Sequence, residues 1–390
     1  MVKGLCYYLT MAKQNILIVA GEASGELYAS HLVRAIKEID PKVRFFGLGG
    51  ERMRSEGVEL YCNIVEIAVM GYLEVAKSLL NFKKIFDGLL KKVDKSPCDL
   101  AILVDYPDFN LRLAKELKKR GIPVIYYISP QVWAWKKKRL KTIKEVVSRM
   151  IVIFPFEEEI YKKEGIPVSF PGNPLLDIVV PSLSKKELFN KFHIPGSRYT
   201  VALLPGSRTS EVKSHLPIML DTAKILKDRA RDIEFLVLRS PTVKEDVFKD
   251  IMRNYQLPLY LLSGATYEGI AASDFAIAAS GTATLETAIL GTPMVLMYRV
   301  AFLTWVLVRL LVKLPYVGIV NILFKKKIVP EFLQFDAKAE RIAPVVIKAL
   351  TEPEELAQMK ASLLKVGSIL GEKGASRRAA KIILDFPENA

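Results

Sequence analysis

The chain has 390 residues, of which 51% are hydrophobic and 25% are charged, and this composition excludes an intrinsically disordered protein. The length exceeds that of one ordinary hydrophobic core and fits two domains. A formal net charge of +15 favours an anionic partner, and nucleic acid, anionic lipid and a phosphorylated substrate are all candidates. No nucleic-acid-binding motif accompanies the tightest basic runs, at 136–139 and 325–327, so we expect no nucleic-acid partner.

The three cysteines, Cys6, Cys62 and Cys98, lie far apart, which disfavours a disulfide framework and a zinc site and fits a reducing cytoplasm. No Asp-x-Asp pair occurs in the sequence, and a metal-bridged diphosphate usually needs clustered carboxylates. We therefore expect neither a metal nor a cofactor. Residues 1–10 contain one short apolar patch without a clear cleavage site, so we do not interpret them as a signal peptide.

The N-terminal half alternates short apolar runs with helical patterns. A glycine turn at 21–25 follows the first run and leads into a helix, in which Leu32, Ile36 and Ile39 recur at helical spacing. Strands are expected at 15–20, 44–47, 100–105, 124–128, 150–154 and 168–170. Continuous apolar strands that alternate with helices indicate a parallel sheet covered on both faces.

The pattern restarts in the C-terminal half, after a linker rich in Pro and Ser at 171–185. Strands are expected there at 200–204, 234–238, 259–261, 275–279 and 294–297. The sequence therefore predicts the α/β class, with two doubly wound Rossmann-like parallel-sheet domains, 1–178 and 179–390, and a ligand cleft between them. The last helix is a candidate to pack back on the first domain.

The strongest local signal in the sequence is the turn Ser280-Gly281-Thr282, where a buried strand ends and a helix begins. Gly281 lets the backbone approach a ligand closely, and the N–H groups up to Ala283 suit a diphosphate. Glu286 lies one turn into the helix, where its carboxylate could accept hydrogen bonds from ribose hydroxyls. The alternative is an ordinary capped helix.

A second turn of this kind is Gly206-Ser207-Arg208, where again a strand runs into a glycine loop and a helix start. Arg208 offers a fixed cation and a forked donor to a phosphate, although a solvated arginine in a tight turn is the alternative. Both turns would lie at the same sheet edge, so together they favour a diphosphate site.

Two carboxylates of the N-terminal half are candidates for a general base, because each follows a predicted strand. Glu22 stands after the first strand, and Asp108 lies in the loop after the third, where helix capping is the alternative role. Trp133 and Trp135, beside a basic run, suit either stacking on a sugar or acyl chain or simple packing. None of the three histidines has sequence neighbours that indicate a proton relay.

Two apolar stretches, 69–82 and 301–314, each include or precede basic residues. The second has only 14 residues and two charges, Arg309 and Lys313, and is too short to span a bilayer. Buried core helices are favoured over an interfacial surface when these patterns are considered alone.

Taken in order, eight segments resemble the lipid-A-disaccharide synthase family of Gram-negative bacteria. They are AGEASGE (20–26), IAVMGYLEV (67–75), DYPDFN (105–110), SPQVWAW (129–135), LPGSR (204–208) with EV following, ASGTATLE (279–286), PYVGIVNIL (315–323) and VPEFLQ (329–334). The resemblance implies a GT-B fold and an inverting, metal-independent transfer at the cytoplasmic face of the inner membrane. It implies UDP-2,3-diacylglucosamine as donor and 2,3-diacylglucosamine 1-phosphate (lipid X) as acceptor.

The products would be a β(1→6)-linked disaccharide 1-phosphate and UDP, in lipid A and lipopolysaccharide biosynthesis. An anionic membrane surface would be a further partner, and the oligomeric state is open, with a homodimer as one candidate. By the same analogy the two apolar stretches become membrane or acyl contacts rather than core. Their contact residues would be Val69, Met70, Leu73, Leu79, Leu80, Phe82, Phe302 and Trp305.

The resemblance also assigns roles to single residues. Glu22 and Asp108 match acidic positions that the family uses for activity, and Arg208 matches its diphosphate-contacting arginine. The loop from Ser280 to Glu286 and Asn321 match its nucleotide site. The chain departs from the family at Glu26, which is usually Asp, and at Asn173, which is usually His.

Two other functions are compatible with these patterns. One is another GT-B enzyme, such as a UDP-GlcNAc transferase acting on a peptidoglycan lipid or a UDP-GlcNAc 2-epimerase. The other is a non-catalytic basic scaffold at a membrane surface. Acylation discriminates among the enzymes, because only the synthase requires a donor and an acceptor that both carry acyl chains.

Overall fold

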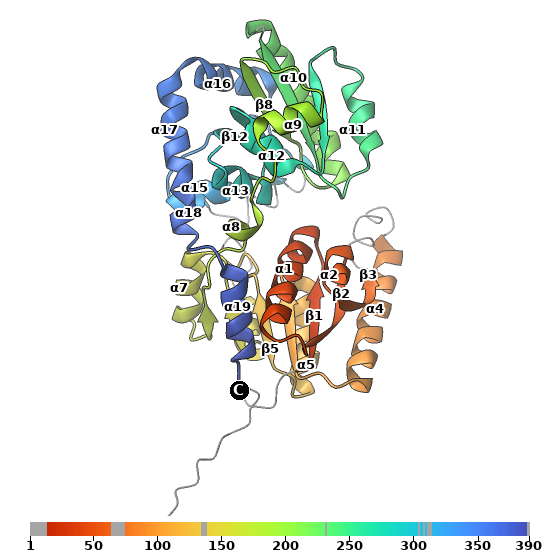
Figure 1. Cartoon of the computed structure of the whole chain (residues 1–390). Coiled ribbons are helices and arrows are strands. Elements are labelled where there is room, and N and C mark those ends of the chain that lie inside the picture. The colour runs from red at the N-terminus through yellow and green to blue at the C-terminus, as the bar shows by residue number, and fades with distance from the viewer. Residues whose placement is uncertain are drawn as a thin grey trace, which may run out of the picture. The chain divides into compact units, whose positions relative to one another are not determined.

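The structure is a computed structural model that describes residues 14–63, 75–133, 139–230, 232–302, 305–306, 309 and 314–387, side chains at 75–81 excepted. It divides into two compact units (Figure 1). The N-terminal unit is Met1–Gly172 together with Gly374–Ala390, and the C-terminal unit is Asn173–Lys373. The boundary between the units falls after Gly172, earlier than the predicted boundary after residue 178. The last helix belongs to the N-terminal unit.

The N-terminal unit is a seven-stranded sheet with helices in the connections between its strands. Its elements are β1 (Asn15–Ala20), α1 (Ala23–Ile39), β2 (Arg44–Gly49), α2 (Glu51–Ser55), β3 (Val58–Asn63), α4 (Val75–Lys95), β4 (Leu100–Val104), α5 (Pro107–Lys119), β5 (Val124–Tyr127), α6 (Arg139–Val146), β6 (Arg149–Ile151), α7 (Pro155–Lys163), β7 (Val168–Ser169) and α19 (Ala375–Leu384). The strand order is β3-β2-β1-β4-β5-β6-β7, and the described pairings are parallel. β1 and β4 are central, which is why both are continuous apolar runs.

The C-terminal unit repeats this plan with six strands. Its elements are α8 (Leu175–Ile178), α9 (Lys185–Lys191), β8 (Tyr199–Leu204), α10 (Thr209–Arg229), β9 (Ile233–Arg239), α11 (Glu245–Met252), β10 (Leu259–Ser263), α12 (Thr266–Ala272), β11 (Phe275–Ala279), α13 (Thr282–Ile289), β12 (Met294–Tyr298), α15 (Ile319–Phe324), β13 (Glu331–Leu333), α16 (Ala339–Thr351), α17 (Pro353–Leu364) and α18 (Val366–Ile369). The strand order is β10-β9-β8-β11-β12-β13. Two doubly wound parallel sheets confirm the predicted fold class.

The two strands that the sequence did not indicate, β3 and β13, lie at sheet edges. Both are only partly buried and carry charged or polar side chains, such as Glu59 in β3 and Glu331 in β13. Because these two strands are so little buried, they lack the continuous apolar run by which the central strands are recognised.

Each sheet has one point at which the direction of winding reverses. In the N-terminal unit the chain proceeds outward from β1 to β3 and then returns to β4 on the other side of β1. In the C-terminal unit it proceeds from β8 to β10 and returns to β11 beside β8. In doubly wound sheets, ligands bind at the carboxyl ends of the two strands that flank such a point.

Helix α19 contacts α1 of the N-terminal unit (Figure 1). Its apolar side, which includes Ala379, Ala380 and Ile383, is buried. The Arg378 Nε–H donates a 2.7 Å hydrogen bond to the carbonyl oxygen of Pro171, which attaches the segment after β7 to this helix. The N-terminal unit is thus completed by residues that follow the whole C-terminal unit in the sequence.

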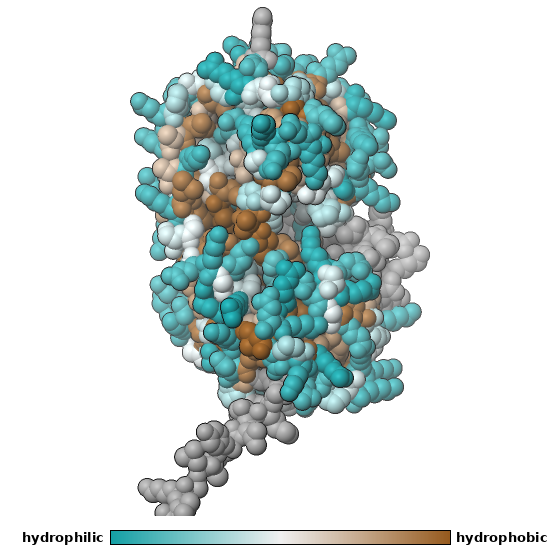
Figure 2. Space-filling view, in the orientation of Figure 1, coloured by the Kyte–Doolittle hydropathy of each residue, from teal (hydrophilic) through white to brown (hydrophobic). Residues whose placement is uncertain are grey.

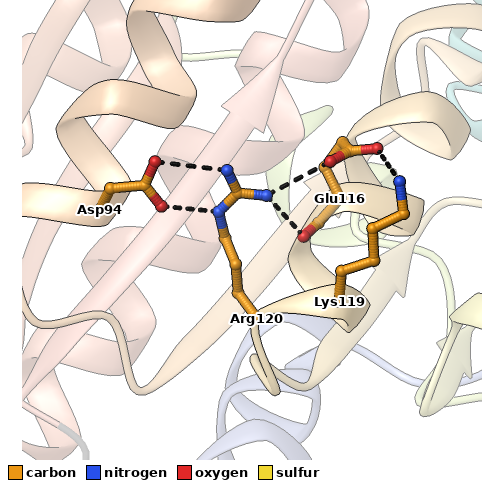
Figure 3. Close-up of polar contacts among 4 residues, drawn as sticks. All are labelled: Asp94, Glu116, Lys119 and Arg120. Carbon is orange, nitrogen blue, oxygen red and sulfur yellow. Dashed lines mark hydrogen bonds and ion pairs between the residues drawn. The ribbon is translucent and has the colours of Figure 1, made fainter.

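An ion-pair network joins the C-terminal ends of α4 and α5 (Figure 3). The Arg120 guanidinium donates to both carboxylate oxygens of Asp94, at 2.7 and 3.3 Å, and also to the Glu116 backbone and side chain. Its hydrogen bond lowers the pKa of the Asp94 carboxyl. The bidentate geometry fixes α4, where three predicted acyl contacts lie, against α5, which carries Asp108.

Hydrophilic side chains cover most of the face shown in Figure 2, with smaller hydrophobic groups between them. Within the described ranges, no helix is both long enough and apolar enough to cross a membrane.

Candidate active site

The two glycine turns of the C-terminal unit lie side by side at its reversal point. β8 and β11 are paired in parallel up to Leu204 and Ala278, so the turns that follow them start at the same sheet edge. One turn leads into α10 and the other into α13. The structure therefore brings together Gly206–Arg208 and Ser280–Ala283, as the sequence predicts.

The start of α13 has the features of an anion site. Gly281 is the N-cap residue, with φ of 154°, and a Cβ placed there would meet nothing within 4 Å. A glycine has no side chain to cap the helix, and none of the described residues in the first turn is acidic. The N–H groups of Thr282 and Ala283 have no partner inside the helix, because the first turn of any helix lacks preceding carbonyls. The ordinary side-chain cap considered for this turn is therefore absent.

Glu286 is half-buried one turn into α13 and accepts a hydrogen bond of 3.3 Å from the Tyr267 hydroxyl. The tyrosine comes from α12, so it fixes the carboxylate from a neighbouring helix. One Glu286 oxygen is thereby oriented, which suits a group that accepts from hydroxyls of a ligand. Its contact with ribose stays a prediction.

Arg208 stands at the N-cap position of α10, and its guanidinium Nη1 lies 3.2 Å from Glu211 Oε1. The arginine side chain is 51% exposed, whereas that of Glu211 is 17% exposed. The pair therefore holds the cation at the surface of the turn, with the carboxylate behind it. Glu211 follows the LPGSR segment in the sequence, but the sequence gives no indication of this contact.

Asn321 is fully buried, and the structure gives its amide an internal role. The Nδ2 group donates to Val329 O and to Glu331 Oε1, at 2.9 and 2.8 Å. The Oδ1 atom accepts from the N–H groups of Ile328 and Val329, at 2.7 and 2.9 Å. Asn321 thus joins α15 to the segment that enters β13, and its predicted contact with the nucleotide stays a prediction.

Glu331 explains why the motifs at 315–323 and 329–334 occur together. Its two oxygens accept from the N–H groups of Val317 and Gly318, each at 3.0 Å, and one of them also accepts from Asn321. The first motif thus supplies a helix start, and the second supplies the carboxylate that satisfies it.

Glu22 and Asp108 lie at the reversal point of the N-terminal sheet, where β1 and β4 pair up to Ala20 and Val104. Glu22 is the exposed N-cap residue of α1. Asp108 is 74% exposed in the first turn of α5, where its carboxylate pairs with the Arg139 guanidinium of α6. The N-cap residue of α5 is Tyr106, so the helix-capping role considered for Asp108 is wrong.

The structure adds Asp105 to these carboxylates. Asp105 and Tyr106 both have φ of 48°, a left-handed conformation that is strained for residues other than glycine. Asn110 Nδ2 and the Tyr126 hydroxyl both donate to the Asp105 carbonyl, and the Tyr106 ring occupies the space beside Gly21 where a Cβ would lie. The surroundings thus hold this conformation in place.

Burial, together with the nearby charge of Glu22, raises the pKa of the Asp105 carboxyl to about 6, against the opposing effects of the Tyr106 backbone and of Arg139. The sequence does contain a signal for Asp105, because Asp105 is the first polar residue after a central strand. Its burial and its proximity to Glu22 depend on the pairing of β1 with β4.

The family departures fall on residues with structural roles. Glu26 is buried, accepts from the Arg52 N–H at 2.8 Å, and so satisfies the start of α2. Asn173 is fully buried and accepts from the Leu175 N–H at 3.0 Å, at the start of α8.

Trp133 is half-buried and packs in the N-terminal unit. Its Nε1–H donates to Glu157 Oε1 at 3.2 Å, and its ring lies edge-on to Phe156 with centroids 5.3 Å apart. These contacts favour packing over the stacking role considered for it, and Trp135 lies outside the described residues. His215, fully buried, bonds through its two ring nitrogens to backbone atoms of Pro205 and Arg299, and so links the β8 and β12 loops.

The predicted membrane or acyl contacts are only partly described. Val69, Met70 and Leu73, and the side chains of Leu79 and Leu80, lie outside the described residues. Phe82 packs edge-on against Phe109, with centroids 4.9 Å apart, at the margin of the N-terminal core. Phe302 and Trp305 neighbour Phe335 in the C-terminal unit.

The structural role of Asn321 gives one prediction. Asn321→Ala removes the partners of two buried N–H groups and one carboxylate, and should lower the free energy of unfolding by about 3 kcal/mol. Urea denaturation measures the loss, with Asn254→Ala, at an exposed side chain, as a control expected to cost less than about 0.5 kcal/mol. Unchanged stability with lost UDP affinity would instead support a direct nucleotide contact.

The raised pKa of Asp105 gives a second prediction. Because the folded pKa lies above the ordinary value of about 3.9, the native state binds the proton more tightly than the unfolded chain does. Wild-type stability should therefore fall, relative to that of Asp105→Asn, as pH rises from about 4 to about 6, and stay lower above that range. Urea midpoints of both proteins at pH 4.5 and 7 measure this, and a difference independent of pH would contradict it.

Comparison with known proteins identifies the family. The family model for lipid-A-disaccharide synthetase (LpxB) matches residues 16–384. Lipid-A-disaccharide synthase of Syntrophus aciditrophicus is 44% identical over 375 residues, covering 96% of this chain and 98% of that protein. The synthase of Geobacter metallireducens is 41% identical over 378 residues, covering 97% and 98%.

Solved structures share the fold at much lower identity. UDP-GlcNAc 2-epimerase from Neisseria meningitidis, bound to UDP-GlcNAc, has a TM-score of 0.65 at 12% identity, covering 96% of this chain and 99% of that one. The S. aureus MnaA–UDP structure has a TM-score of 0.64 at 12% identity, covering 95% and 96%. At such identity the likeness supports the two-domain GT-B fold alone, whereas the matches to the synthases extend over nearly the whole sequence. The chain belongs to the lipid-A-disaccharide synthase family.

Proposed function

We propose that this protein transfers 2,3-diacylglucosamine from UDP-2,3-diacylglucosamine to the 6-hydroxyl of lipid X. The products are the β(1→6)-linked lipid A disaccharide 1-phosphate and UDP. The observation that carries the proposal is a family match over nearly the whole chain, joined to an uncapped helix start at the reversal point of the C-terminal sheet. The epimerase alternative draws only on a likeness of fold at 12% identity.

The C-terminal unit binds the nucleotide in this proposal. The N–H groups at the start of α13 donate hydrogen bonds to the diphosphate, and Gly281 leaves open the space that the phosphate oxygens need. Arg208 adds a cation from the neighbouring loop, and Glu286 accepts hydrogen bonds from the ribose. The neighbour solved with UDP supports this assignment, because it has the same fold.

The N-terminal unit supplies the acid–base chemistry. The acceptor's 6-oxygen forms a bond to the anomeric carbon while the bond from that carbon to the diphosphate oxygen breaks, and UDP leaves with the electron pair. Asp108 takes the proton from the hydroxyl, with Glu22 as positioning group or alternative base. Charge that develops on the departing diphosphate is stabilised by Arg208 and the α13 N–H groups.

An aromatic cluster of Phe302, Trp305 and Phe335 supports a contact with acyl chains or an anionic membrane at the cytoplasmic face of the inner membrane. Phe302 is 58% exposed and Phe335 57% exposed, although large apolar side chains are usually buried. Ring centroids of Trp305 and Phe335 lie 5.2 Å apart, and the Arg309 guanidinium lies 5.4 Å from the Trp305 ring. Exposed aromatic rings beside a cation are typical of surfaces that bind anionic lipid. A homodimer stays a prediction.

The reaction is tested by incubating the protein with UDP-2,3-diacylglucosamine and lipid X, followed by mass spectrometry. The expected result is the disaccharide 1-phosphate with an equal amount of UDP. Isomerised sugar nucleotide without UDP release would favour an epimerase, and binding to vesicles without either product would favour the scaffold.

Asp108→Asn, in the same assay, should reduce turnover at least about 100-fold, because the amide cannot accept the hydroxyl proton. UDP affinity, measured by calorimetry, should stay within about twofold of wild type, since Asp108 belongs to the other unit. Full turnover by this variant would remove Asp108 from the role of base.

Replacing Phe302 and Phe335 together by Ser should weaken binding to phosphatidylglycerol vesicles by about tenfold or more, because two exposed rings lose their contact with lipid. Leu364→Ser is the matched control, since Leu364 is also 57% exposed but belongs to α17. Vesicle co-sedimentation at low salt measures both. Equal binding by the double variant and the control would contradict the membrane role of the cluster.

A further inference from the structure

Glu211 makes contacts that the proposed reaction does not yet use. It occupies the third position of α10, and its Oε2 atom accepts from the N–H groups of Ser207 and Arg208, at 3.0 and 3.3 Å. Its Oε1 atom accepts from Arg208 Nη1 at 3.2 Å. One carboxylate therefore holds both the backbone of the turn and the side chain of the arginine.

The rest of the turn is held from other elements. His215 Nδ1 lies 2.9 Å from the carbonyl oxygen of Pro205, and the Thr242 hydroxyl donates to the carbonyl oxygen of Ser207. Gly206 has φ of 123°, and a Cβ there would lie 2.5 Å from Glu211 Oε2. The glycine is thus required both by the backbone conformation and by the close approach of the carboxylate.

The two helix starts at this reversal point consequently differ in charge. The first turn of α13 contains no acidic residue, and its N-cap residue makes no side-chain cap. At α10 the corresponding region is occupied by the carboxylate of Glu211, which would repel a phosphate placed there. A diphosphate can therefore be received by backbone N–H groups at α13, while at α10 the Ser207 and Arg208 N–H groups are occupied and the exposed guanidinium carries the positive charge.

We propose that Glu211 is a positioning residue for the transfer reaction, which sets the conformation of the 206–208 turn and orients the Arg208 guanidinium for the diphosphate. The inference rests on the proposed function, because it takes UDP as the ligand of this edge. The simpler alternative is that Glu211 only caps α10 and affects stability alone.

Glu187 provides a matched control for that alternative. It holds the same third position in α9, where its carboxylate accepts from the Ser184 N–H at 2.8 Å. The start of α9 lies at the amino ends of the strands, opposite the glycine turns, because Lys185 Nζ is 4.0 Å from Asp274, which immediately precedes β11. Glu187→Gln therefore removes an equivalent cap away from the nucleotide.

The test measures UDP affinity by calorimetry for wild type, Glu211→Gln, Arg208→Ala, the double variant and Glu187→Gln. Wild-type binding tests the proposed function by itself, and its absence would refute nucleotide binding whatever Glu211 does. Glu211→Gln should weaken UDP binding about tenfold in the presence of Arg208, and less than about twofold in the Arg208→Ala background. Glu187→Gln should bind UDP as wild type does.

Equal losses in the two backgrounds would show that Glu211 does not act through Arg208, and would overturn the proposal. So would wild-type affinity in folded Glu211→Gln, which would reduce the residue to a helix cap. If Glu211→Gln does not fold, Glu211→Asp replaces it, because this variant keeps a carboxylate for the N–H groups but withdraws it from the guanidinium. Its UDP affinity should fall only where Arg208 is present, and a loss in both backgrounds would equally refute the role.

Discussion

Parallel pairing of β8 with β11, and of β1 with β4, is the constraint on which the rest of the molecule depends. The carboxyl ends of parallel strands lie at the same end of the sheet. The reversal of winding leaves this end uncovered between the two central strands. Residues far apart in the sequence, such as Arg208 and Ser280, or Glu22 and Asp108, are brought to the same end of a sheet only through this pairing. The buried apolar runs of these strands, which carry no functional group, thereby determine where the polar groups stand.

Carboxylates satisfy N–H groups at several of the helix starts. They are Glu26, Glu157, Glu187, Glu211 and Glu331, at α2, α7, α9, α10 and α15. Each places a negative charge at a helix start, which disfavours the binding of an external anion there. The start of α13 has a glycine at the N-cap and no acidic residue in its first turn. It lies beside the central pair of strands, where ligands bind in doubly wound sheets. Charge distribution and topology therefore indicate the same place.

Much of this architecture could be predicted from the sequence, because central strands are continuous apolar runs and glycine turns follow them directly. The edge strands β3 and β13 could not, since a half-exposed strand resembles a loop in composition. Glu211 and Asp105 were missed for a different reason: their roles depend on contacts with Arg208 and Glu22 that appear only after the chain has folded. The internal hydrogen bonds of Asn321 likewise involve residues seven to ten positions away, which periodicity does not reveal.

Helix α19 closes the N-terminal unit after the C-terminal unit has been completed along the sequence, which makes the C-terminal unit an insertion within the other. On the ribosome, every residue of the C-terminal unit emerges before the helix that contacts α1. The N-terminal unit must therefore wait with part of its apolar surface uncovered while the inserted unit can already fold. The order of synthesis thus favours earlier folding of the C-terminal unit, and gives the N-terminal unit the later and more vulnerable step.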